Sequence, residues 1–207
     1  MRVSLSEAVS VASGIFVFAL GAAVYSPAWA QGQQTARLLG TIERASGTTL
    51  AVKTSADVRE VAIAPNTTVF GMVKATLADV KPGVFVGVGA TPQSDGSQQA
   101  IRVMIFPESM RGLGEGHRPW DRPGTTMTNA TVETAVSGVE GQVLRVRYRG
   151  GEQKIVIGQD ASLLTYVEGE RAELKPGSAV SVSAVVKADG ALEATRIVVG
   201  RGGVVPN

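Results

Sequence analysis

The chain has no cysteine among its 207 residues, and His117 is its only histidine. The absence of cysteine excludes disulfide bonds, thiolate metal sites, cysteine nucleophiles and a lipidated cysteine anchor. Charged residues are also few, at 18%, and 20 basic residues nearly balance 18 acidic ones. Because a net charge of +2 provides little counterion release, the composition does not favour binding to nucleic acid.

Small and apolar residues are abundant instead. Hydrophobic residues make up 44% of the chain, and 25 glycines stand against an aromatic content of 5%. This apolar content is enough for a packed core, and the small residues are more typical of β-rich than of helical proteins.

The first 30 residues have the pattern of an export signal. Arg2 supplies positive charge, residues 8–24 form an apolar stretch, and Ala28-Trp29-Ala30 places small residues at the two positions of a signal peptidase site. We therefore expect cleavage after Ala30 and a periplasmic or secreted mature protein that makes no membrane contact. A retained membrane anchor is the alternative, because the stretch approaches spanning length.

The strongest pattern is an internal repeat with an offset of 94 positions. Lys81-Pro82-Gly83 recurs as Lys175-Pro176-Gly177, and Ala100-x-Arg102 recurs as Ala194-x-Arg196. At the same offset, Val86 and Val88 align with Val180 and Val182 without a gap. These valines are predicted to be buried in both copies, because equivalent apolar positions must face equivalent cores.

Each copy alternates apolar and polar residues with a period of two, which is typical of β-strands. The copies cover residues 36–106 and 131–199, with five to six short strands in each. We predict an all-β protein in which each copy closes into one small OB-like β-barrel, because closure leaves no unpaired strand edge. An SH3-like barrel and a small β-sandwich are the competing folds.

Residues 107–130 lack this alternation and are rich in Gly and Pro, which predicts an irregular linker, and residues 200–207 are expected to be a flexible tail. The linker holds a candidate partner surface formed by His117, Arg118, Trp120 and Asp121. We expect Trp120 to pack against a barrel, because burying an indole offsets the entropy of ordering a short segment.

A second candidate surface is a row of arginines. Arg145, Arg147 and Arg149 alternate along one predicted strand and would project from the same face, where they could bind an anionic ligand. The simpler interpretation is a solvated face on which acidic residues such as Glu140 or Glu152 lie opposite the arginines.

The repeated unit resembles a family of secreted bacterial domains of unknown function with OB-like β units. The resemblance rests on the Lys-Pro-Gly turn, the Val-x-Val strand, the Asp-Gly hairpin and the closing Ala-x-Arg strand, and also on the linker around residues 110–130. It implies the fold and a Gram-negative envelope protein. It implies no activity and transfers no catalytic residue.

We therefore expect an exported, non-enzymatic binding or scaffolding protein of the bacterial cell envelope, with an envelope protein or an anionic ligand as partner. No catalytic residue, metal ligand or cofactor is assigned, since no nucleophile elbow and no recognised metal spacing is present. One alternative is a metal-binding accessory protein that uses Glu115, His117 and Asp121, although nearby arginines would oppose a cation. A hydrolase acting on an envelope polymer is the other.

Overall fold

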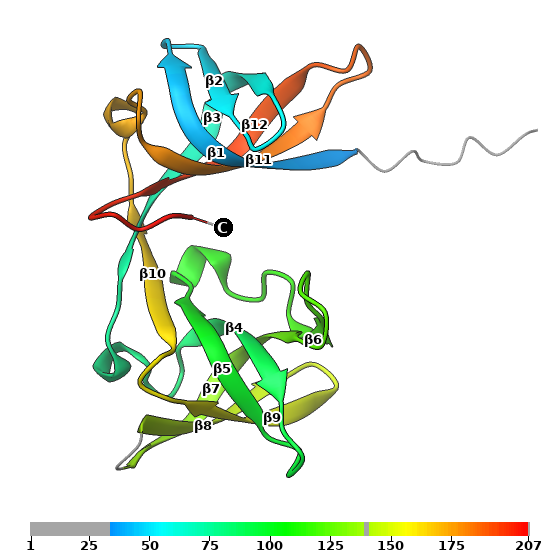
Figure 1. The fold of residues 1–207 in the computed structure, drawn as a ribbon, viewed down its shortest axis with the longest axis vertical. Helices are drawn as coiled ribbons and strands as arrows, with labels where there is room; N and C mark the ends of the chain where they lie inside the picture. Colours follow the sequence, from blue (N-terminus) through cyan, green and yellow to red (C-terminus); the bar gives the residue numbers. More distant parts are fainter. Residues whose placement is uncertain (1–33, 139–140, 207) are drawn as a thin grey trace, which may run out of the picture. The chain divides into compact units, whose positions relative to one another are not determined.

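A computed structural model describes residues 34–138 and 141–206, and this part of the chain is all-β (Figure 1). The predicted signal peptide and its cleavage site lie outside the described residues. The strands are β1 (Thr35–Ala45), β2 (Thr49–Lys53), β3 (Val58–Lys74), β4 (Phe85–Pro92), β5 (Gln98–Ile105), β6 (Gly116–Pro119), β7 (Thr126–Gly138), β8 (Gly141–Tyr148), β9 (Gly151–Ile157), β10 (Ser162–Glu168), β11 (Ala179–Val186) and β12 (Leu192–Gly200).

Short 3-10 helices, η1 (Leu77–Asp79), η2 (Glu108–Met110) and η3 (Arg171–Glu173), are the helical elements of the described residues. Within that same part of the chain, no helix is long and apolar enough to cross a membrane.

Five strands close the first barrel in the order β1-β2-β3-β12-β11, and β11 pairs back onto β1. The pairing of β3 with β12 is parallel and the other pairings are antiparallel. The second barrel closes in the order β7-β8-β9-β5-β4, again with one parallel contact, between β9 and β5. This five-stranded closure confirms the predicted OB-like fold class.

The two barrels do not coincide with the two repeats. β11 and β12 come from the second repeat but complete the barrel of β1, β2 and β3, whereas β4 and β5 of the first repeat complete the other barrel. In Figure 1 the barrel that contains β1 therefore combines blue and cyan strands with orange and red ones. The expectation that residues 36–106 and 131–199 each close a barrel of their own is corrected by this exchange of strands.

The exchange obeys the repeat offset. In the first barrel, Ile63 of β3 lies opposite Ala194 of β12. The residue equivalent to Ile63 in the second repeat is Ile157 of β9, and β9 pairs with β5, the strand equivalent to β12. Thr68 lies opposite Arg196, and the equivalent Ser162 lies opposite Arg102. Each repeat thus gives three strands to one barrel and two to the other, which makes the arrangement two-fold symmetric within one chain.

Each barrel encloses its own apolar core. The four valines predicted to be buried are fully enclosed, Val180 and Val182 in the first barrel and Val86 and Val88 in the second. The period-two pattern places them inward on strands that close a barrel.

The offset of 94 positions does not align the first strands of the two repeats, β1 and β7. Ala45 lies opposite Leu50, whereas Ala135 lies opposite Leu144, so the second hairpin spans four more positions. Strand β7 consequently starts at Thr126, earlier than the predicted start at residue 131.

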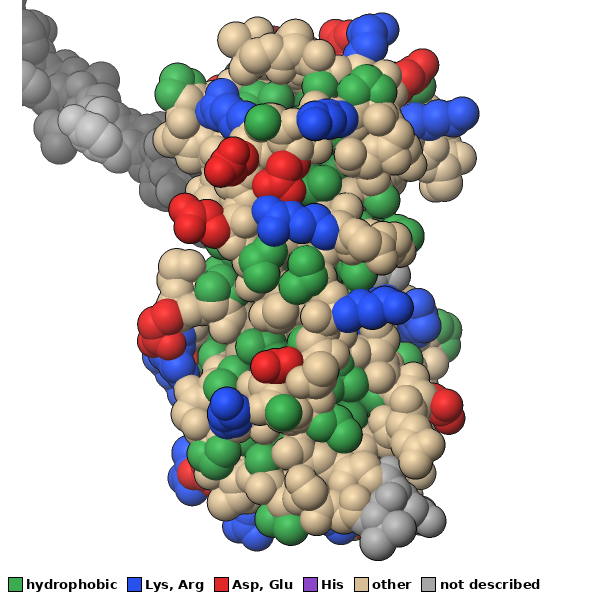
Figure 2. Space-filling model, turned by 90° about the vertical axis from the view of Figure 1, so that its left-hand side faces the viewer, with side chains coloured by type: hydrophobic (Ala, Val, Ile, Leu, Met, Phe, Trp, Pro, Cys, Tyr) green, Lys and Arg blue, Asp and Glu red, His purple; other side chains and the backbone are tan. Residues whose placement is uncertain are grey.

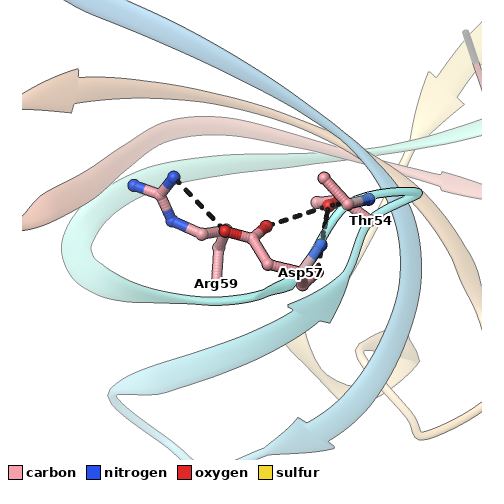
Figure 3. A network of polar contacts seen from close by, with 4 residues as sticks. Thr54, Asp57 and Arg59 are labelled. Carbon is pink, nitrogen blue, oxygen red and sulfur yellow. Dashed lines mark hydrogen bonds and ion pairs between the residues drawn. The ribbon is translucent and has the colours of Figure 1, made fainter.

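Polar turns fix the barrel hairpins. Between β2 and β3, the Thr54 hydroxyl donates to the Asp57 carbonyl oxygen at 2.9 Å and accepts from the Asp57 backbone N–H at 3.1 Å (Figure 3). Arg59 lies 3.8 Å from the Asp57 carboxylate. A Thr side chain that bonds to the backbone in this way stabilises a tight turn.

Two segments are more ordered than the sequence indicated. The linker contains η2 and β6, and β6 pairs with β7. The expected flexible tail instead packs: Val204 is buried, and Arg201 forms hydrogen bonds of 2.7 Å to both carboxylate oxygens of Glu173. Both segments are ordered for the same reason. Although they lack alternating apolar and polar residues, apolar and arginine side chains anchor them to the rest of the fold.

Candidate functional site

The linker candidates lie along β6 and the loop after it. The His117 Nδ1 atom lies 2.8 Å from the Thr128 hydroxyl, and its ring stacks on Tyr148 with 6.3 Å between the ring centroids. Burial lowers the pKa of His117 below its ordinary value. Arg118 is exposed and donates to the Gly114 carbonyl oxygen at 2.8 Å.

Trp120 lies on the second barrel. Its ring covers Gly89 of β4 so closely that a Cβ atom on this glycine would overlap the indole. The guanidinium of Arg122 lies 5.4 Å from the Trp120 ring centroid, a cation–π distance. Asp121, between these two residues, is exposed.

The predicted row of arginines is paired with acids. Arg145 lies 3.5 Å from Glu152, Arg147 forms an ion pair with Glu133, and this pairing raises the pKa of Arg147. Arg149 does not belong to the strand, because β8 ends at Tyr148. Two of the three side chains thus have acidic partners, as in the simpler interpretation of this surface.

The structure brings part of the linker to the end of this row. The backbone N–H of Arg149 donates to Glu115 Oε1 at 2.8 Å, and Tyr148 stacks on His117. Glu115, His117 and Asp121 are not grouped by the fold: within the part of the chain that the structure describes, no three His, Asp or Glu side chains are placed together so that they could hold a metal ion.

A different group of residues converges where the strands are exchanged. Strands β12, β3, β10 and β5 lie side by side in this order, and residues directly opposite one another project to the same side. We call this surface the central face. Its residues are Arg196 and Val198 on β12, Thr68, Phe70, Met72 and Lys74 on β3, Ser162, Leu164, Tyr166 and Glu168 on β10, and Arg102 and Met104 on β5, and Phe106 directly after β5 continues it.

Aromatic rings form the middle of the central face. Tyr166 makes an edge contact with Phe70 at 5.9 Å and stacks on Phe106 at 5.7 Å between centroids. Phe106 in turn contacts Phe85 at 5.6 Å. The three rings of Phe70, Phe106 and Tyr166 are only half-buried, so aromatic surface remains accessible.

Arginines surround these rings. Burial raises the pKa of the Tyr166 hydroxyl, and the positive charges of Arg196, Arg37 and Arg102 partly offset that rise. Burial lowers the pKa of Arg102, and the charges of Arg122 and Arg37 lower it further, while Asp121 acts in the opposite direction. Three strands and the linker therefore direct positive charge to one place.

Side-chain contacts orient two of these arginines. The Nε atom of Arg37 donates to the Ser181 hydroxyl at 3.2 Å. The guanidinium of Arg196 lies 3.9 Å from the sulfur of Met110, which η2 of the linker buries. These contacts link the cluster to β11 and to the linker.

Sequence reasoning singled out Arg102 and Arg196 only as parts of a structural repeat and missed Tyr166. A usable signal existed, because an arginine recurs at the same position of both closing strands, where apolar residues surround it.

On the face shown in Figure 2, basic side chains occur beside exposed hydrophobic ones, with acidic side chains interspersed.

A comparison with protein families finds a model described as "Domain of unknown function (DUF5666)", which matches residues 40–104 and 135–198. The two matches cover more than half of the chain and coincide with the repeats. No curated protein matches the sequence, and no solved structure matches it.

Proposed function

Because this chain belongs to the DUF5666 family, whose members are domains of unknown function, we propose its role from its own surface: it binds an anionic ligand on the central face. In this proposal it is an exported, non-enzymatic binding protein of the bacterial cell envelope. The exported part of the proposal rests on the signal pattern of residues 1–30.

The observation that supports anion binding is the convergence of Arg102 and Arg196 on Tyr166. These arginines occupy one position of the repeat, and the strand exchange brings both copies, together with Arg37, within electrostatic range of one hydroxyl. Gathering like charges costs free energy that a bound anion would recover. Guanidinium groups also match carboxylate and phosphate oxygens in a bidentate geometry.

The rings between the arginines supply the apolar part of the proposed site. Binding sites combine apolar and aromatic surface with a few placed polar groups. Phe70, Tyr166 and Phe106 provide that surface, and the arginines provide the charge. A ligand with acidic groups separated by a ring or chain would satisfy both.

Calorimetric titration of the full chain with an oligogalacturonate, a polycarboxylate probe, tests the proposal. Arg102→Gln and Arg196→Gln should each weaken affinity roughly tenfold or more, because each removes a charge-assisted hydrogen-bond donor. Arg145→Gln is the matched control, since it removes the same charge from a side chain that is 61% exposed and ion-paired on the second barrel.

Each outcome has a consequence. Equal losses for Arg145→Gln and Arg102→Gln would show nonspecific charge binding and overturn the proposal, and a larger loss for Arg145→Gln would assign the site to β8 instead. Chromatography of the recovered probe provides the second readout. Shortened oligosaccharide chains would show that the protein cleaves the probe and would overturn the non-enzymatic role.

A further inference from the structure

A pocket of about 500 Å³ lies at the Arg102 end of the central face. Its walls come from the end of β3, from β5, from the start of β10 and from the segment after β12. The lining residues are Lys74, Ala75, Arg102, Ala161, Ser162, Leu163, Leu164, Gly203, Val204 and Val205. This volume falls within the range of small-molecule sites, which is roughly 300–1,000 Å³.

The polar side chains of this pocket are two cations and one hydroxyl. Ser162 lies directly opposite Arg102 in the β10–β5 pairing, and Lys74 lies opposite Leu164 on the other side of β10. The remaining lining side chains are aliphatic. A cationic group of this kind beside aliphatic walls fits a molecule that carries one acidic group and one apolar part.

The other end of the central face lacks this combination, although the repeat places equivalent residues there. Glu168 occupies the position equivalent to Lys74, and its backbone carbonyl accepts a hydrogen bond from Arg201 at 2.8 Å. An acid in place of the lysine weakens the attraction for an anion at that end, which keeps only Arg196 of the two equivalent cations. The two ends have therefore diverged, and the Arg102 end is the better suited of the two to an acidic group.

The wall after β12 is anchored but leaves apolar surface open. Val204 is buried in the cluster that contains Leu164 and Met104, and the backbone N–H of Arg201 donates to the Met72 carbonyl oxygen at 2.9 Å. Val205 is 63% exposed. An exposed valine at the rim of a cationic pocket gives a bound aliphatic chain a surface to cover.

We infer that this pocket binds a small amphiphilic anion, an alkyl carboxylate or alkyl phosphate. Its acidic group lies among Lys74, Arg102 and Ser162, and its chain lies along Leu164 and Val205. This inference rests on the proposed anion-binding function and specifies the ligand class at one end of the central face. Under this inference, binding requires both the acidic group and the alkyl chain of the ligand.

Calorimetry with the full chain and four probes tests both requirements. Decanoate and decyl phosphate should bind, whereas acetate and decanol should bind at least tenfold more weakly, because each lacks one of the two parts. A preference for one of the two amphiphiles identifies the headgroup. Lys74→Gln should weaken decanoate binding roughly tenfold, and Ser162→Ala should weaken it less. Lys154→Gln, on a lysine paired with Asp95 at 3.5 Å, is the control.

The results separate this inference from the proposed function. Tight binding of oligogalacturonate with no binding of either amphiphile would overturn the amphiphile site and leave the anion-binding role intact. Equal effects of Lys74→Gln and Lys154→Gln would also overturn it, by showing adsorption through general charge. Binding of decanol as tight as that of decanoate would show an apolar site without a role for the cations.

Discussion

Met72 and Tyr166 occupy the same position in the two repeats and lie directly opposite each other where β3 pairs with β10. The pairs on either side are exchanged by the same symmetry: Val73 lies opposite Thr165, and their equivalents in the other repeat, Val167 and Gly71, lie opposite each other. The two-fold axis that relates the repeats therefore passes through this pair. Because the axis lies in a sheet that joins strands of both repeats, each pair of opposed residues on one side of it has an equivalent pair on the other side.

The chain has no cysteine of its own, and the strand exchange predicts which pairs of introduced cysteines form a disulfide. Thr35 of β1 lies opposite Val185 of β11, and the residue of the first repeat equivalent to Val185 is Thr91. Oxidised Thr35→Cys/Val185→Cys protein should contain an intramolecular disulfide, because directly opposed antiparallel residues lie about 4.5–5.5 Å apart. Thr35→Cys/Thr91→Cys should stay reduced. Non-reducing electrophoresis distinguishes them, and the opposite pattern would show that each repeat closes its own barrel.

The two Lys-Pro-Gly turns should be sensitive to substitution. Gly83 and Gly177 both have φ of +88°, with open space where a Cβ atom would stand. Gly83→Val and Gly177→Val should each lower the free energy of unfolding by about 1–3 kcal/mol, since a β-branched residue is strained there. Urea denaturation measures the loss. Gly47→Val is the control because Gly47 has open space without a positive φ, and an equal loss there would contradict this explanation.

Gly89 should control the environment of Trp120. A valine at this position would overlap the indole that now covers the glycine, so Gly89→Val should displace the ring from β4. In a background carrying Trp29→Phe, the emission of Trp120 should shift to longer wavelength and become more accessible to iodide. Unchanged emission would show that the ring does not depend on the contact with Gly89.

His117 should make stability depend on pH. Burial lowers its pKa in the folded chain, whereas in the unfolded chain it titrates near an ordinary value of about 6.5. Below that pH the unfolded chain binds a proton that the folded chain resists, so stability should fall as the pH decreases. The urea midpoint should therefore drop more between pH 7.5 and pH 5.5 in the native chain than in His117→Asn. Equal drops would assign the whole effect to carboxylates.

The sequence by itself determined the local structure of this protein. Period-two alternation placed Val86, Val88, Val180 and Val182 inward on strands, and they are buried in two barrel cores. The repeated glycines determined the Lys-Pro-Gly turns, because the positive φ of these turns favours glycine. Both signals act over a few residues, so a single sequence is enough to read them.

Only the tertiary structure decided which strands share a barrel and which residues share a site. Because the repeats present similar apolar faces, β12 fits against β3 by the same pattern that would let β5 do so, and periodicity does not distinguish the two partners. The 17-residue strand β3 runs unbroken to Lys74, where it pairs with β10 instead of turning back. That continuity brings Arg102 and Arg196, which are 94 positions apart in sequence, onto one face, where they lie on either side of Tyr166 and both act on its hydroxyl.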